Sequence, residues 1–312
     1  MTPTLRVAAG VLLRADGAVL LAQRPPGKPW AGYWEFQGGK LEPGESSREA
    51  LARELDEELG IRVRRAAAWL TQSFTYPHAQ VELEFFRVFA WDGDPVGRDG
   101  QAFAWQQPGA ISVTPLLPAN SRVLASLSLA PVYAITCADE VGEASFLERA
   151  ASALRNGLRL VQLREKARDE SGRARFATRL ADLARPYGAR ILLNGDAGEA
   201  RALGLAGVHW TSATLARASA RPNDLLVAAS CHDRAELDRA ATLAVDFAVL
   251  GPVRRTASHP DANPLGWARF AEIVSATRIP VYALGGLSHD DLGIAIENGA
   301  HGVALRSGAW PA

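Results

Sequence analysis

The glutamates within residues 39–61, GKLEPGESSREALARELDEELGI, are the side chains of this chain best suited to chemistry. On a helix, Glu54, Glu57 and Glu58 occupy positions i, i+3 and i+4, so they share one stripe of its surface beside an apolar stripe of leucines. A solvated structural helix usually alternates its charges, whereas Glu54 and Glu58 repel each other across one turn. A bound cation would reverse that repulsion. Because the nearby ligands are all oxygens, the pattern predicts a site for Mg²⁺, with Mn²⁺ as the alternative.

The residues before this helix are typical of loops that approach phosphates. The tripeptides Gly-Gly-Lys at 38–40 and Pro-Gly-Glu at 43–45 supply turns in which the backbone can come close to a ligand. Arg53 can pair with Glu49 or Glu57 and so orient their carboxylates. The loop and the helix together therefore predict a site for a phosphorylated substrate.

With its full spacing, segment 39–61 resembles the Nudix box, because every position of that pattern is occupied. The resemblance implies an α/β/α sandwich and a hydrolase of nucleoside diphosphates linked to another moiety. It implies that Glu54, Glu57 and Glu58 are metal ligands. It also places Arg53 in the catalytic group, with either Glu54 or Glu45 helping to activate the attacking water.

Four shorter matches resemble the MutT type of 8-oxo-dGTP diphosphatase: Arg24 after the second strand, residues 34–36, residues 100–101 and residues 117–120. The resemblance implies hydrolysis of 8-oxo-dGTP to 8-oxo-dGMP and pyrophosphate, which clears the nucleotide pool and avoids mutation during DNA replication and repair. It makes Asp99 a further metal ligand. The substrate-binding residues implied are Arg24, Phe36, Gly38, Gly39, Lys40 and Asn120, with Asn120 contacting the oxidised base through its amide.

Each of these side matches has a plainer interpretation. Phe36 could be part of the core, Arg24 could be solvated, and Asn120 could be a helix N-cap. Gln37 stands where the family usually has proline, and residues 76–79 replace a Pro-Asp-Arg run. A Nudix hydrolase of another diphosphate, such as ADP-ribose or a pyrophosphate of the thiamin pathway, is therefore the alternative.

The pattern of elements changes near Leu129. Before it, strand patterns at 7–13, 19–23, 66–75 and 81–91, a helix at 46–59 and a closing helix after Pro118 indicate an α+β module. After it, eight short apolar strands alternate with seven helices, which predicts a (β/α)8 barrel without its last helix, because few residues follow Arg306. The predicted domains are 1–129 and 130–312. The predicted barrel strands are 132–137, 158–164, 189–194, 207–210, 225–231, 247–253, 280–285 and 302–306.

The second domain resembles thiamine phosphate synthase and its relative, the TenI thiazole tautomerase, over nearly all of residues 131–307. Barrel active sites lie where strands end, so phosphate-binding residues are implied there: Gln162, Arg164, Lys166, Asn194, Ser230, Gly285 and Gly286. The synthase holds a magnesium-bound pyrophosphate with two aspartates, whereas this chain has Gly195 and Thr214 at those positions.

Asp196 lies one residue out of register with the first of these aspartates, and His259 stands where a lysine is expected. We therefore expect no synthase activity, while His232 lies near the position of the tautomerase histidine. Three interpretations remain: a working thiamin enzyme, a sensor that binds thiazole phosphate or thiamine phosphate and regulates the hydrolase, or a retained scaffold.

The amino-acid composition narrows the classes of partner and ligand that the chain can be expected to bind. The 312 residues include 34 Lys plus Arg and 34 Asp plus Glu, so the broad basic field that polynucleotide binding needs is missing, and free nucleotides fit better. Cys137 and Cys231 lie far apart in the sequence without a paired spacing, so the sequence gives little support to a zinc site or a disulfide framework. The apolar run at 7–13 is too short for a signal peptide or a membrane span, so we expect a cytoplasmic protein without membrane partners.

Overall fold

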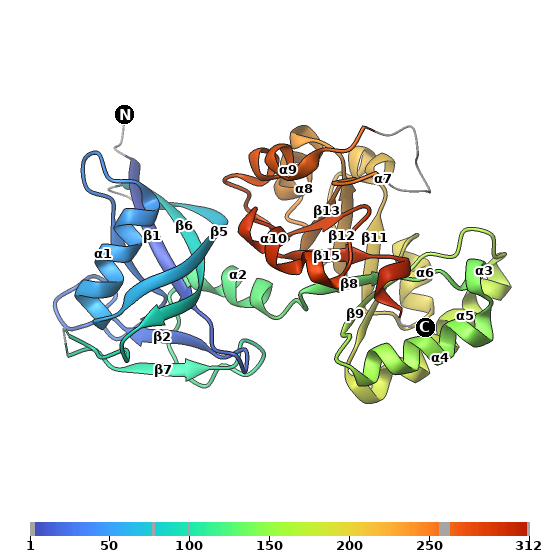
Figure 1. Cartoon of the computed structure of the whole chain (residues 1–312), viewed down its shortest axis with the longest axis horizontal. Coiled ribbons are helices and arrows are strands. Elements are labelled where there is room, and N and C mark those ends of the chain that lie inside the picture. Colours follow the sequence, from blue (N-terminus) through green and yellow to red (C-terminus); the bar gives the residue numbers. More distant parts are fainter. Residues whose placement is uncertain (1–3, 77–78, 99, 256–262, 311–312) are drawn as a thin grey trace. The chain divides into compact units, whose positions relative to one another are not determined.

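The computed structural model describes residues 4–76, 79–98, 100–255 and 263–310. The chain divides into two compact units, residues 1–128 and 129–312 (Figure 1). The first unit is the expected α/β/α sandwich, and the second is the expected barrel of eight parallel strands with fewer than eight helices. None of the helices in the described ranges is both long and apolar enough to cross a membrane.

Two sheets build the first unit. In the larger, β1 (Thr4–Leu12) pairs in parallel with β6 and antiparallel with β4, and the long hairpin of β5 and β6 completes the order β4-β1-β6-β5. The smaller sheet has the antiparallel order β3-β2-β7. The bounds of the other strands are β2 Val19–Gln23, β3 Trp34–Glu35, β4 Gln37–Lys40, β5 Arg62–Tyr76, β6 Ala79–Asp92 and β7 Phe103–Gln106.

Helices α1 (Ser47–Leu59) and α2 (Pro118–Leu127) cover opposite faces of the larger sheet. Successive residues of a strand point to opposite faces, and accordingly Ala8 packs in the core cluster beneath α1 whereas Ala9 packs in the cluster beneath α2. The apolar layer between α1 and the sheet fixes the distance of this helix from the strands. It thereby positions the glutamates on the other side of the helix.

Local sequence explains where α1 begins and ends. Ser46 is its N-cap and forms a reciprocal capping box with Glu49, and Gly60 ends the helix in the left-handed conformation with φ of 69°. The three leucines predicted to face the core, Leu51, Leu55 and Leu59, are fully buried. Burying a leucine side chain stabilises the fold by about 1.5–3 kcal/mol, so this stripe fixes the rotation of the helix.

The eight strands of the second unit close into a barrel in the order β10-β11-β12-β13-β14-β15-β8-β9. Large side chains fill its interior, with Tyr133, Phe247 and Tyr282 in mutual ring contact. The strands are β8 Val132–Ile135, β9 Leu160–Leu163, β10 Arg190–Leu193, β11 Gly207–Trp210, β12 Leu226–Cys231, β13 Phe247–Leu250, β14 Val281–Leu284 and β15 Gly302–Leu305.

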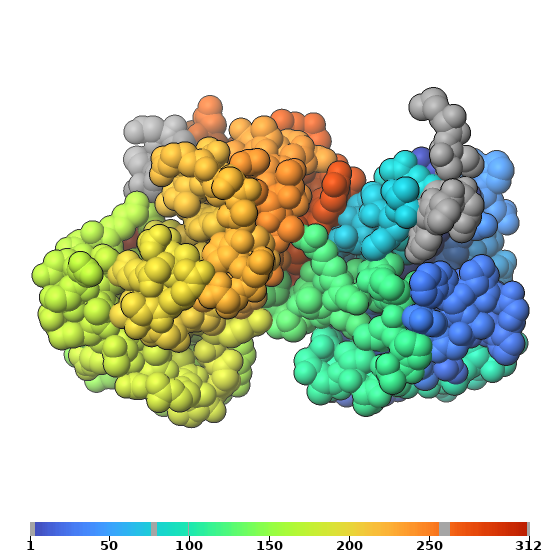
Figure 2. Space-filling view, turned by 180° about the vertical axis from the view of Figure 1, so that it is seen from behind, coloured from blue at the N-terminus to red at the C-terminus, as the bar shows by residue number. Residues whose placement is uncertain are grey.

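Within the described part of the second unit, seven helices of six or more residues follow the first seven barrel strands. Helix α7, which follows β11, and helix α8, which follows β12, belong to the gold and orange surface in Figure 2. The helices are α4 Glu143–Arg155, α5 Glu170–Ala184, α6 Ala197–Ala202, α7 Ser212–Arg217, α8 Arg234–Thr242, α9 Gly266–Val274 and α10 Leu292–Glu297, and a short α3, Ala138–Val141, precedes α4.

In place of an eighth helix, the described chain after β15 makes a single 3-10 turn, Ser307–Ala309, and then Trp310. The indole Nε1 of Trp310 donates to the carbonyl of Ile135 at 2.8 Å, and its ring packs edge-on against Phe146 with 4.7 Å between centroids. Trp310 is buried. Trp310 thus joins the end of the described chain to β8 and α4.

Candidate functional site

The loop before α1 and the middle of that helix are in direct contact in the first unit. A Cβ built on Gly39 would lie 2.0 Å from the carboxylate carbon of Glu54. Only glycine therefore allows Glu54 to pack against β4 in this position. The glycine that the sequence assigned to phosphate approach also makes room for a carboxylate.

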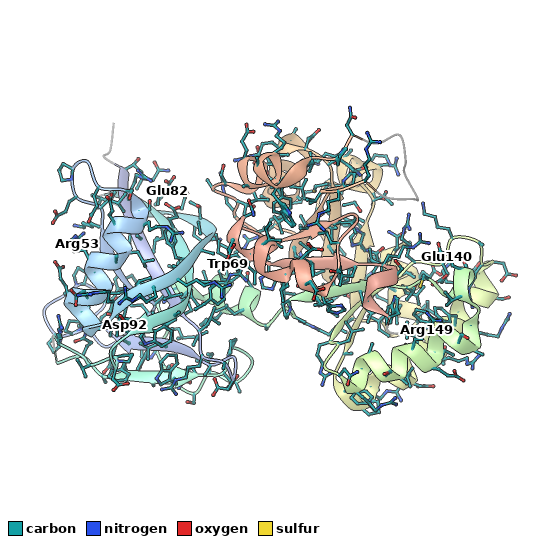
Figure 3. All side chains as sticks on the ribbon, viewed as in Figure 1. Arg53, Trp69, Glu82, Asp92, Glu140 and Arg149 are labelled. Carbon is teal, nitrogen blue, oxygen red and sulfur yellow. The ribbon has the colours of Figure 1, made fainter. Side chains whose placement is uncertain are left out.

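Arg53, which is labelled in Figure 3, forms ion pairs with three carboxylates through one guanidinium. Its Nε and Nη2 donate to the two oxygens of Glu45 at 2.9 and 3.0 Å, and its Nη1 donates to Glu54 at 2.9 Å and Glu57 at 3.2 Å. Nη2 also donates to the carbonyl of Lys40 at 3.0 Å, which ties the helix to β4. The hydrogen bonds with Glu45 and Glu54 raise the pKa of Arg53, so it stays charged.

The pairing partly differs from the sequence prediction. Glu57 does pair with Arg53, but Glu49 does not, because its carboxylate accepts from the backbone and hydroxyl of Ser46 in the capping box. Glu45, from the loop, takes the place predicted for Glu49. The fourth glutamate, Glu58, faces the ammonium of Lys28 at 3.6 Å.

These side chains suit a divalent cation by their chemistry. Within the described ranges no group of three or more His, Cys, Asp or Glu is close enough to hold a metal ion as placed, and Asp99 lies outside those ranges. Yet two of the predicted ligands, Glu54 and Glu57, converge on Arg53 together with Glu45, whereas Glu58 faces Lys28. All four carboxylates offer oxygen ligands. Hard cations such as Mg²⁺ prefer such donors, so the set fits the metal that the sequence predicts.

In the second unit, a cavity of about 760 Å³ opens where the barrel strands end. Three of the predicted phosphate-binding side chains line it, Gln162, Arg164 and Ser230, together with the glycines at 285 and 286. Its other lining residues include Glu140, His209, His232, Arg255 and Arg306. Sequence reasoning named neither Glu140 nor Arg306 as a site residue.

A buried polar chain crosses the floor of this cavity. His209 shares one hydrogen bond with the Tyr133 hydroxyl at 3.1 Å and another with the Ser230 hydroxyl at 2.8 Å. Gln162 donates to the same tyrosine at 3.4 Å, and Asn194 donates to the carbonyl of His209 at 3.2 Å. Burial lowers the pKa of His209 to about 3, so its ring is neutral at physiological pH.

Comparison with known proteins assigns each of the two units to a family. The NUDIX domain model matches residues 8–126, and the thiamine monophosphate synthase model matches residues 132–309. The 8-oxo-dGTP diphosphatase of Haemophilus influenzae is 37% identical over 120 residues, 38% of this chain and 88% of the relative. The CTP pyrophosphohydrolase of Escherichia coli is 38% identical over 120 residues, with the same coverage of both chains. The thiamine-phosphate synthase of Chromobacterium violaceum is 35% identical over 187 residues, 58% of this chain and 88% of the relative.

The chain is a Nudix protein fused to a thiamine monophosphate synthase-family barrel. Its Nudix unit is related to the 8-oxo-dGTP diphosphatases and to the CTP pyrophosphohydrolase at similar identity. The names of these relatives thus agree on hydrolysis of a nucleoside triphosphate and differ in which nucleotide it is.

The predicted base-contacting residues of the Nudix unit lie near Trp34 and Glu35. Asn120 is buried in the first turn of α2, and its amide donates to the carbonyl of Trp34 at 3.4 Å, while Leu117 rather than Asn120 is the N-cap. Arg24 is not simply solvated, because its Nη1 lies 2.6 Å from both oxygens of Glu35. Burial raises the pKa of Glu35 although Arg24 opposes the effect.

Phe36 is part of the core and packs edge-on against Phe85, with 6.1 Å between ring centroids. Lys40 is exposed at the end of β4. Sequence reasoning missed the pairing of Arg24 with Glu35. An arginine and a glutamate eleven residues apart give no signal until β2 and β3 pair.

Several barrel residues are committed to local structure. Asp196, which lies one residue out of register with a missing aspartate, caps α6 by accepting from two backbone amides. Thr214 pairs with the N-cap Thr211 of α7. Lys166 is exposed and does not line the cavity, His232 pairs with Glu236 at 2.9 Å, and His259 lies outside the described residues.

Proposed function

We propose that the Nudix unit is a magnesium-dependent nucleoside triphosphate pyrophosphohydrolase, with 8-oxo-dGTP its favoured substrate. It would release the nucleoside monophosphate and pyrophosphate. The observation that carries the proposal is the convergence of Glu45, Glu54 and Glu57 on Arg53 beside the Gly39 loop. The named relatives support the substrate class.

Glu54, Glu57 and Glu58 would hold the metal, with Asp99 as a further ligand. Bound there, the metal would neutralise charge on the phosphates and favour ionisation of water. Arg53 would keep the loop and helix together through Glu45 and the Lys40 carbonyl. Its positive charge would also balance the carboxylates before substrate arrives.

Between the two candidates for general base, the contacts favour Glu54. Both oxygens of Glu45 already accept hydrogen bonds from Arg53, and one also accepts from the backbone of Glu42 at 2.9 Å. These bonds lower the pKa of Glu45 and make it a weaker base. Glu54 uses one oxygen for Arg53, and its other oxygen has no hydrogen bond within the described part of the chain.

A panel of nucleotides assayed for kcat/KM with magnesium tests the substrate. It should contain 8-oxo-dGTP, dGTP, CTP, ADP-ribose and thiamine pyrophosphate, and we expect 8-oxo-dGTP to have the highest value. Preference for CTP or for a thiamin pyrophosphate would overturn this assignment while leaving the Nudix chemistry intact.

Asn120→Ala examines base recognition in the same panel. If the amide contacts the oxidised purine, kcat/KM should fall more for 8-oxo-dGTP than for dGTP, by about tenfold to a hundredfold, because a lost buried hydrogen bond costs about 1–3 kcal/mol. An equal loss for both nucleotides would assign Asn120 to holding Trp34 instead. Ser126→Ala, a buried polar residue of the same helix whose hydroxyl bonds to the Arg122 carbonyl, is the matched control.

For the barrel, we propose binding of a phosphorylated thiamin-pathway ligand, such as thiazole phosphate or thiamine phosphate, without condensation of the synthase substrates. The cavity and its polar lining support binding. Gly195 and Thr214 provide no carboxylate for a metal-held pyrophosphate. Formation of thiamine phosphate by the full-length protein, abolished by Arg164→Ala, would show that the chain is bifunctional.

A further inference from the structure

Two arginines face the same part of the barrel cavity from different strand ends. Arg164 follows β9 and Arg306 follows β15, and β8 is the one strand between them in the barrel order. Helix α3, reached from β8, contributes Glu140, which forms an ion pair with Arg306 (Figure 3 labels Glu140). Three consecutive strand ends therefore contribute Arg164, Glu140 and Arg306 to the lining of one cavity.

Neither guanidinium is satisfied by the residues around it. Arg164 is half-buried, and within the described residues its side chain has no hydrogen bond or ion pair. Arg306 bonds to Glu140 through Nη2, but its Nε is buried without a hydrogen-bond partner in the described chain. A buried donor without a partner costs about 1–3 kcal/mol, so a ligand that accepts from both groups would be favoured.

The electrostatics favour an anion in this place. Burial lowers the pKa of Arg164, and the nearby charge of Arg306 lowers it further. The charges of Glu140 and Glu165 oppose this lowering but do not cancel it. Glu165 is buried and already accepts from the backbone amides of Ala138 and Asp139 at 2.9 and 2.8 Å. Arginine guanidinium groups match phosphate oxygens in geometry as well as charge.

We propose that Arg164 and Arg306 form a metal-independent site for a phosphate monoester, with Glu140 as a counter-ion that the ligand displaces from Arg306. The inference rests on the proposed ligand binding by the barrel and names the residues and the charge balance responsible. The apolar part of the cavity, formed by Ile135, Val249 and Leu284 among others, would take the organic part of the ester.

Calorimetric titration of the full chain with thiamine phosphate, in excess EDTA and separately in magnesium, tests the site. We expect binding in EDTA that magnesium does not strengthen. Arg306→Ala should weaken it by about tenfold to a hundredfold, the usual effect of removing a charged hydrogen-bond donor. Arg201→Ala, which removes an arginine paired with Asp224 and does not line the cavity, should leave the affinity unchanged.

Glu140→Gln gives a result of opposite sign. Removing the competing carboxylate should tighten binding, whereas a merely structural Glu140–Arg306 pair would make the same variant bind more weakly. Inorganic phosphate, titrated alone, should bind more weakly than the ester and with the same dependence on Arg306.

The outcomes separate the two proposals. Absence of binding by wild type, with or without magnesium, would overturn both the proposed barrel ligand and this site. Binding that requires magnesium, or that is unchanged in Arg306→Ala, would overturn the arginine site alone.

Discussion

Gly39→Ala is the most direct test of the Nudix site, because one methyl group would occupy the place of the Glu54 carboxylate. The added Cβ would lie 2.0 Å from the carboxylate carbon and one oxygen and 2.3 Å from the other oxygen. Non-bonded carbons approach to about 3.5 Å at best, so the carboxylate must retreat by about 1.5 Å. The backbone of Gly39 is not left-handed, so the variant adds no strain of that kind.

A displacement of this size should remove most of the activity and little of the stability. A misplacement of about 1 Å at a reacting group can lower a rate a hundredfold, so we expect kcat/KM to fall at least about a hundredfold. The displaced atoms are the end of a flexible side chain. The free energy of unfolding should therefore change by less than about 1 kcal/mol.

Two other glycines provide controls for the assay of nucleotide hydrolysis and thermal unfolding. At Gly109 a Cβ meets nothing within 4 Å, so Gly109→Ala should change neither quantity. At Gly38, with φ of 152°, a Cβ would lie 2.0 Å from the carbonyl oxygen of Ala8 in β1, so Gly38→Ala should unfold the sheet. Wild-type kcat/KM in Gly39→Ala, or destabilisation equal to that of Gly38→Ala, would refute the reasoning.

Three further changes test other parts of the molecule. Trp310→Ala should lower the unfolding free energy by about 3–5 kcal/mol, because it removes the ring packed on Phe146, as denaturant unfolding can measure. Lowering the pH from 7 to 5 should destabilise the barrel by about 2 kcal/mol through His209. The histidine of the unfolded chain gains a proton below about pH 6.5, whereas the pKa of His209 in the folded chain is about 3, so protonation favours the unfolded state. Arg24→Met should cost about 2 kcal/mol by leaving Glu35 unpaired, and Glu35→Gln added to it should recover part of that loss in thermal unfolding.

Each of these three predictions can be contradicted by a second variant. Trp310→Phe keeps an aromatic ring but loses the indole N–H that bonds to Ile135, so equal losses in both variants would mean that packing is not the main effect. His209→Gln should flatten the pH dependence, and an unchanged slope would assign it to other groups. If Arg24 contacts the nucleotide, KM should stay raised in the Arg24 and Glu35 double variant even where stability returns.

The elements that could be predicted from the sequence are those whose signals are local and repeated. Helix α1 was placed to within one residue, because its N-cap, its leucine stripe and Gly60 lie in one continuous segment. All eight barrel strands were found, because each is a short apolar run between helices. Strands β3, β4 and β7 were missed, since they have two to four residues and β4 contains two glycines.

Partners of charged side chains were harder to predict than the side chains themselves. The spacing on α1 allowed Arg53 to reach Glu49 or Glu57 equally well. The capping box removed Glu49 as a partner, and the fold of the loop supplied Glu45, eight residues away. Competition of this kind is decided by tertiary structure, which single-segment reasoning does not include.

In the barrel too, tertiary structure decides which charged side chains lie together, and the residues that differ from the synthase pattern can be considered in that light. A single arginine after the last strand does not indicate a binding site in the sequence, because only the closed strand order brings Arg306 near Arg164. A pyrophosphate held by a metal needs carboxylates at that site, whereas a phosphate held by arginines would be repelled by them. Gly195 and Thr214 supply no carboxylate for such a metal, while Arg164 and Arg306 supply positive charge to the cavity itself.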